Sequence, residues 1–292
     1  MGETTAMNGR SERLGRGKAI AWAPVPREHG AWVMLYAPML AAFAVSPATY
    51  WWGYAALALS AFALMFLREA VSYAQCKHWR RRDTTWVIVY GLAVSAFAVP
   101  LMVTGWGPEL AVPAMFAGLI FSVHTGLSAL PFRKRFDRST AGEILGASAA
   151  SLSAPAATVV ACGHCTVEGW ILAGVFWAYF SGRILHVNML LDAAKYRRDF
   201  TCDVASKVAT PLSVYMVALG VILLVGISQP SIRIWSLVGT AAVAPSTISS
   251  LIAQRHLGDR VPSLKRVGLQ ETIFAIWVAS VIIFAHIVGH SL

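Results

Sequence analysis

Residues 208–227 read VATPLSVYMVALGVILLVGI, a stretch of twenty residues without a charged side chain. A helical residue rises about 1.5 Å and the apolar core of a bilayer is about 30 Å thick, so about 20 apolar residues cross it. Lipid offers the backbone no hydrogen-bond partners, and the stretch lacks the alternation of a barrel strand. It therefore predicts a transmembrane helix.

Eight further apolar runs flank this one along the chain. The nine runs are 31–45, 50–74, 86–103, 110–130, 144–161, 167–191, 208–227, 234–253 and 272–288. Pro38 and Pro113 make the first and the fourth run the weakest of the nine. Only 13% of the residues are charged, whereas a soluble domain carries about 25%. We predict an all-α integral membrane protein of about nine transmembrane helices, with a disordered tail at residues 1–20 and one polytopic domain at 21–292.

The net charge of +10 comes from cations that are distributed by topology. Of the 24 Lys and Arg residues, 21 lie before the first run or in the loops that follow the second, fourth, sixth and eighth runs. The exceptions are Arg68, Arg183 and Arg233. The positive-inside rule then predicts a cytoplasmic N-terminus and an outer C-terminus. This distribution argues for a lipid bilayer as the partner and against nucleic acid. It predicts a multi-pass protein of the bacterial inner (plasma) membrane.

Ionisable residues gather at the predicted cytoplasmic ends of the runs. They include Glu28, His29, Arg68, Glu69, Glu143, Arg183, His186 and Glu271. Such residues are costly within a membrane, so they are candidates for a functional site. For Glu28 and His29 a helix cap and interfacial anchor is an equal alternative.

One polar stripe leaves the membrane after the sixth run. Asn188, Asp192, Lys195, Asp199 and Asp203 follow at steps of 4, 3, 4 and 4, which places them on one side of a helix. Carboxylates in such a stripe repel one another unless a cation lies among them, and Mg²⁺ prefers oxygen ligands of this kind. The alternative is a solvated helix end whose aspartates are neutralised by Lys195 and neighbouring arginines.

Two of the four cysteines form a Cys-Gly-His-Cys segment, Cys162 to Cys165, in the short loop after the fifth run. A lone C-x-x-C lacks the second half of a zinc site. A local disulfide or two idle thiols are therefore favoured over a metal or redox role.

Three segments resemble known families. The pattern Asp199-x3-Asp203-x2-Ser206-Lys207-x2-Thr210-Pro211 resembles the second aspartate-rich motif of the UbiA superfamily of intramembrane prenyltransferases. Residues 130–135, LPFRKR, with Glu143-x2-Gly146 resemble that superfamily's segment between spans four and five. The opening EHGAW at residues 28–32 is similar to the start of the YwiC-like family.

The UbiA resemblance implies a UbiA-like bundle that uses Mg²⁺ to ionise a prenyl diphosphate for transfer to a lipophilic acceptor. It implies that Asp199 and Asp203 hold the metal, with Asp192 and Asn188 in support as the remaining catalytic residues. The groups implied to bind the substrate are Arg68, Glu69, Lys134, Arg135, Arg183, His186, Lys207, Glu28 and His29.

The sequence departs from that superfamily where its first motif, N-D-x2-D-x3-D, is expected. Residues 68–78 read REAVSYAQCKH, in which Glu69 is the one acid. Arg68 and the basic run 77–82 are then expected to neutralise a diphosphate directly. The alternatives are a chain that keeps the fold without the chemistry, a small-solute transporter, or an accessory protein of a respiratory complex.

Overall fold

A computed structural model gives the fold, and it describes residues 29–46, 50–76, 81–129, 136, 139–195, 202–228, 233–256 and 264–291. These residues form ten helices and no strand. The helices are α1 (His29–Val45), α2 (Trp51–Cys76), α3 (Arg81–Val103), α4 (Gly107–Ala129), α5 (Thr140–Ser151), α6 (Ser153–Cys162), α7 (Val167–Lys195), α8 (Cys202–Ser228), α9 (Arg233–Arg255) and α10 (Leu264–Ser291). The prediction of an all-helical protein is confirmed for this part of the chain.

Eight of the predicted runs correspond to helical segments that are long and apolar enough to cross a bilayer. The ninth, the run that contains Pro38, forms only a shorter apolar helix at Trp32–Val45. Pro113 lies inside α4, but α4 is still long and apolar enough to cross a bilayer, so the fourth run is not weakened. These findings establish a polytopic helical membrane protein.

The fifth run is interrupted, and it forms two helices, α5 and α6, within one span at Thr140–Cys162. The break falls at Leu152, three residues before Pro155. Pro155 has no N–H to donate to the Ser151 carbonyl, and its ring clashes with a continuing helix, so α5 ends there. Across the break, the Ser153 hydroxyl donates to the Leu35 carbonyl of α1 at 2.9 Å.

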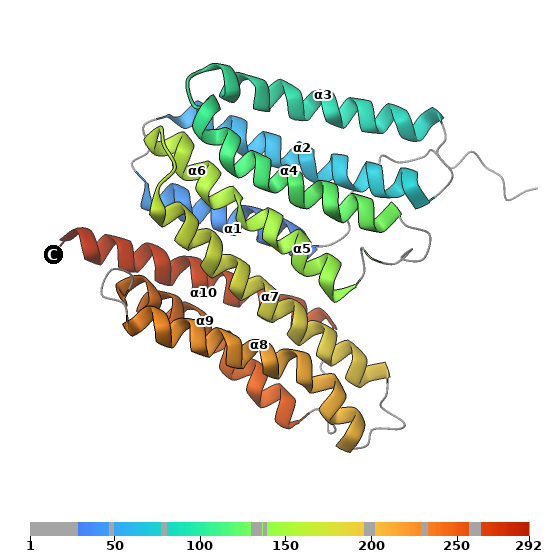
Figure 1. Cartoon of the computed structure of the whole chain (residues 1–292), viewed down its shortest axis with the longest axis vertical. Helices are drawn as coiled ribbons and strands as arrows, with labels where there is room; N and C mark the ends of the chain where they lie inside the picture. The colour runs from blue at the N-terminus through green and yellow to red at the C-terminus, as the bar shows by residue number, and fades with distance from the viewer. Residues whose placement is uncertain are drawn as a thin grey trace, which may run out of the picture.

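Helix α7 and the interrupted span form the centre of the bundle, with α2 to α4 on one side and α8 to α10 on the other (Figure 1). About half of the residues in these two central spans are buried, against 6% in α3 and in α8. The side chains that α3 and α8 expose are large and apolar, such as Leu92 and Leu224. Both helices therefore present their surfaces to lipid.

The helices alternate in direction, so α2, α4 and α7 end on the side where α3, α5 and α8 begin (Figure 1). We call this side the basic end, because the Lys- and Arg-rich loops connect there. The other side, where α6 ends and α7 begins, is the opposite end. The positive-inside rule predicts that the basic end faces the cytoplasm.

Close packing at the centre depends on Gly169 in α7. A Cβ atom at Gly169 would meet the Thr158 hydroxyl and lie 3.0 Å from the Pro155 Cα atom, which is backbone and cannot move aside. Gly174 lies on the same helix, and a Cβ atom there would meet nothing within 4 Å. The approach of α6 to α7 therefore requires a residue without a side chain at 169.

We expect Gly169→Ala to lower the free energy of unfolding by about 1–3 kcal/mol, because it overpacks this contact. The matched change Gly174→Ala should stay within about 0.5 kcal/mol of the parent protein. Unfolding of the purified protein in mixed micelles by titration with SDS measures both values. Equal effects of the two changes would show that the α6–α7 approach is looser than described here.

Candidate functional site

A charged side chain lies deep inside the bundle at Arg183 of α7, which is only 4% exposed. Its Nε donates to Glu271 Oε2 of α10 at 2.6 Å, and a terminal nitrogen pairs with Glu271 Oε1. The planar guanidinium thus meets the carboxylate through two parallel hydrogen bonds, the strongest arrangement for such a pair. The pair joins α7 to α10.

The remaining terminal nitrogen of Arg183 is bound by α9. It donates to the Ser246 carbonyl at 3.0 Å and to the Ser250 hydroxyl at 2.9 Å. The Phe274 ring lies 5.1 Å from the guanidinium carbon, within the range of a cation–π contact. Arg183 is therefore committed to an interhelical cluster, and a substrate anion would have to displace Glu271 to reach it.

The sequence pattern predicted Arg183 as a substrate-binding residue, and that role stays a prediction. The pattern did not point to the two serines, Ser246 and Ser250, or to Glu271 as the partner of Arg183. The available signal was the polar run at residues 246–250, STISS, inside an otherwise apolar span. Serines in a membrane span commonly satisfy a polar group of a neighbouring helix.

His186 follows Arg183 on α7 by nearly one turn and is 2% exposed. Its Nδ1 atom has no hydrogen-bond partner among the residues that the structure describes. An unpartnered buried nitrogen costs free energy, so water or a ligand would be stabilised beside it. The substrate contact predicted for His186 is consistent with this nitrogen and stays a prediction.

Asn188 links α7 to the first turn of α5. Its amide nitrogen donates to the Thr140 hydroxyl at 3.1 Å and to Glu143 Oε2 at 3.0 Å. Ser139 caps α5 by accepting a hydrogen bond from the Gly142 N–H at 3.1 Å. Asn188, a residue of the predicted stripe, thus contacts Glu143, the acid of the segment between spans four and five.

The other predicted residues with described side chains lie nearer the surface. Asp192, one turn beyond Asn188, is exposed at the basic end, and so is Lys207 in α8. Arg68 and Glu69 are half-buried near the basic end of α2, which packs against α1, α3 and α6. Asn188 and Asp192 therefore extend as one stripe from the bundle interior to its surface.

The predicted magnesium ligands cannot be placed in full. Asp199, Lys134, Arg135 and Glu28 lie outside the described residues, and of Asp203 and His29 only the helical backbone is described. Within the described parts of the chain no three His, Cys, Asp or Glu residues gather as a metal site. Glu143, Asn188 and Asp192 supply oxygen donors of the right kind, so a Mg²⁺ ion fits there only if Asp199 and Asp203 complete its ligands.

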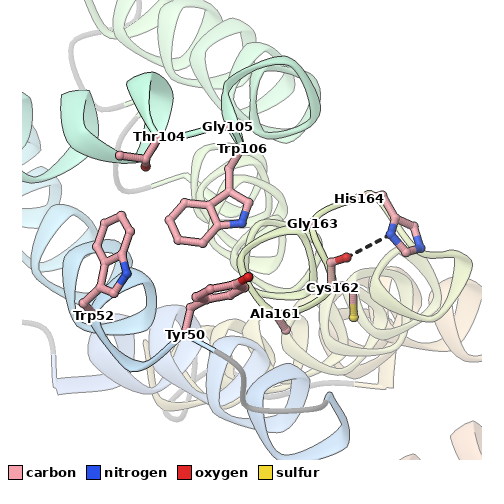
Figure 2. A pocket seen from close by; sticks show the side chains of 9 residues that line it. All are labelled: Tyr50, Trp52, Thr104, Gly105, Trp106, Ala161, Cys162, Gly163 and His164. Carbon is pink, nitrogen blue, oxygen red and sulfur yellow. Dashed lines mark hydrogen bonds between the residues drawn. The ribbon is translucent and has the colours of Figure 1, made fainter.

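Cys162 and Cys165 are both free thiols at the opposite end. The Cys165 N–H donates to Glu109 Oε2 at 3.2 Å, and His164 Nδ1 lies 3.0 Å from the Cys162 carbonyl (Figure 2). Burial, and then the negative charge of Glu109, raises the pKa of the Cys165 thiol above its usual value. Of the two interpretations of this segment, idle thiols agree with the structure and a local disulfide does not.

The fold and its buried ion pair define a polytopic α-helical membrane protein with a polar interior. Residues 25–158 match the model of a family described as YwiC-like protein, which confirms the resemblance seen in EHGAW at residues 28–32. No curated protein and no solved structure matches the chain. The UbiA resemblance therefore stays a prediction.

We expect Glu271→Ala to lower the free energy of unfolding by about 3–5 kcal/mol, because it leaves the Arg183 charge buried without a partner. The matched change Gln270→Ala removes a neutral 2.8 Å hydrogen bond from the neighbouring residue of α10 to Ser249 of α9. It should cost about 1 kcal/mol. The double change Arg183→Met with Glu271→Leu should recover part of the loss. Equal losses for Glu271→Ala and Gln270→Ala in SDS titrations would argue against a net stabilising pair.

We expect Glu109→Gln to speed the alkylation of Cys165 near pH 8, measured with Cys76, Cys162 and Cys202 replaced by serine. Only the thiolate reacts, and a raised pKa lowers the thiolate fraction at a given pH. Removing the Glu109 charge lowers that pKa, so the pH profile of the maleimide reaction should shift to lower pH. The amide of this variant retains an oxygen for the Cys165 N–H. Glu168→Gln is the control, and an equal shift in both variants would contradict the assignment to Glu109.

Proposed function

We propose that this protein binds a prenyl diphosphate at the basic end of the bundle, in the bacterial inner membrane. The observation that carries the proposal is the contact of Asn188 with Glu143. Glu143 belongs to a segment that resembles the UbiA superfamily, and Asn188 begins the polar stripe that continues in sequence to Asp199 and Asp203. The contact supports the proposal because it joins residues 45 positions apart in sequence, both of which the sequence pattern had singled out.

The chemistry of the described groups supports an anionic ligand that carries a cation. Asn188 and Asp192 provide oxygen atoms, and Lys207 provides a positive charge one helix away. Asp199 and Asp203 would hold Mg²⁺ beside them, and the ion would neutralise the diphosphate. Lys134, Arg135 and Arg68 would receive the remaining negative charge.

The isoprenoid chain of such a ligand requires an apolar surface, and the lipid-facing helices of the bundle provide it. Around the polar stripe the buried side chains are apolar, among them Met189, Leu190 and Leu212. The isoprenoid tail would thus lie against apolar side chains, and the diphosphate would lie against the charged groups. This division favours a prenyl diphosphate over a small polar solute.

We place binding ahead of transfer because of α2. Where the UbiA superfamily carries its first aspartate-rich motif, the last part of α2 has Glu69 as its one acid, so one of the two acidic clusters is missing. Transfer would break the C–O bond to the diphosphate, which leaves with the electron pair, and an acceptor would give up a proton as it takes the prenyl group. Release of inorganic diphosphate is the measure of that step.

We expect the purified protein in lipid nanodiscs to bind labelled prenyl diphosphates more tightly with Mg²⁺ than with a chelator. Asp192→Asn should weaken binding by about tenfold in the presence of Mg²⁺, the loss of one charge-assisted interaction. The matched control is Glu168→Gln, which also turns an exposed carboxylate of α7 into an amide but lies at the opposite end.

Unchanged affinity of Asp192→Asn, or equal weakening by Glu168→Gln, would contradict the proposed location. Binding by neither the parent protein nor the variants, with unfolding profiles intact, would favour a transporter or an accessory protein of a respiratory complex. Binding without diphosphate release would define a binding protein rather than a transferase.

A further inference from the structure

An open hollow of about 710 Å³ lies at the opposite end of the bundle, far from the polar stripe (Figure 2). Its walls come from the beginning of α2, from the turn between α3 and α4, and from the loop that follows α6. Tyr50, Trp52 and Trp106 provide its aromatic lining, and Cys162 and His164 close the other side.

Two tight backbone turns shape this hollow. Gly105, just before Trp106, has φ of +97°, and Gly163, between Cys162 and His164, has φ of +80°. Residues with side chains rarely adopt such values, so both positions suit glycine. The turns place Trp106 and the end of α6 on facing sides of the same space (Figure 2).

The aromatic rings form one continuous wall. The ring centroids of Trp52 and Trp106 are 4.8 Å apart, and those of Tyr50 and Trp106 are 5.5 Å apart at 73°. Trp106 is 6% exposed, whereas Tyr50 and Trp52 are nearly half exposed. The two open rings present electron-rich faces, which attract cations, and the buried indole of Trp106 packs against both of them.

The charge around the hollow has one sign. Among the described residues that line it, none is a Lys or an Arg. Glu109 lies in the first turn of α4 and hydrogen-bonds the Cys165 N–H, and Glu168 is close enough to Cys162 to act on it electrostatically. Neither carboxylate forms an ion pair with a described residue. The two carboxylates do not line the hollow themselves, but their negative charge close to its aromatic faces favours a positive ligand.

Interfacial anchoring explains some aromatic residues here but not this wall. Trp51 is 71% exposed and packs only on the edge of Phe43 among the described rings, as expected of a residue at the membrane surface. Trp106, in contrast, is turned inward and buried. Its position indicates a lining residue rather than an anchor.

We propose that this hollow binds an organic ammonium ion, with its carbon groups against Trp52 and Tyr50 and its charge in the field of Glu109 and Glu168. Aromatic faces recognise quaternary ammonium groups in this way. The same chemistry occurs in soluble amines and in the headgroups of phospholipids. This site is separate from the proposed prenyl diphosphate site and does not depend on it.

The test uses the full chain in nanodiscs of phosphatidylglycerol, which carries no ammonium group. Saturable binding of labelled choline is expected, with competition by tetramethylammonium and none by the neutral analogue 3,3-dimethylbutanol. Trp52→Leu should weaken choline binding by about tenfold. The neighbouring Trp51→Leu is the matched control and should leave binding unchanged. Glu109→Gln, which keeps the acceptor for Cys165, should weaken it by about threefold.

No saturable binding of choline by the folded parent protein would overturn the proposal, and so would equal competition by the neutral analogue. Equal effects of Trp51→Leu and Trp52→Leu would also overturn it. Nanodiscs that contain phosphatidylcholine distinguish the source of the ligand. Competition from that lipid would identify a headgroup site, and unchanged choline binding would identify a site for a soluble amine.

Discussion

Lipid cannot hydrogen-bond a peptide group, and the whole architecture follows from that constraint. Each backbone N–H and C=O must be paired within the protein, so the apolar runs become helices. Where the helical pattern fails, at Leu152 and Pro155, the break lies among α1, α6 and α7 rather than against lipid. There a neighbouring hydroxyl, that of Ser153, donates to the Leu35 carbonyl across the gap between α6 and α1. Irregular backbone is tolerated because protein surrounds it.

The same constraint governs side chains. Arg183 is held by the Glu271 carboxylate and by oxygen atoms of Ser246 and Ser250, so its charge is satisfied without water. Asn188 in turn is held by Thr140 and Glu143. Along α7, therefore, each of these two groups connects the central helix to a different neighbour. The polar interior specifies how the two halves of the bundle meet, which apolar packing alone does poorly in lipid.

The sequence was sufficient to predict eight of the nine spans, because the length of an apolar run follows directly from bilayer thickness. The first run was correctly expected to be weak, whereas the fourth, which contains Pro113, forms a helix of full spanning length. Partners were harder to predict. A helix that is apolar all round carries no periodicity to show which side meets which neighbour, because lipid is as apolar as the core. Thus Arg183 was recognised as costly, but nothing in its own span indicated Glu271. The hollow at the opposite end was missed for a similar reason, since Trp52 and Trp106 are separated by a hairpin and look like ordinary interfacial residues.

The Arg183–Glu271 pair has a consequence for the response of the protein to voltage. A single charge that moves across a membrane at 100 mV changes its energy by about 2.3 kcal/mol. Here a positive and a negative group are joined at 2.6 Å and lie at nearly the same depth, so their contributions to gating charge cancel. The pair therefore adds no net charge to a movement that carries α7 and α10 together.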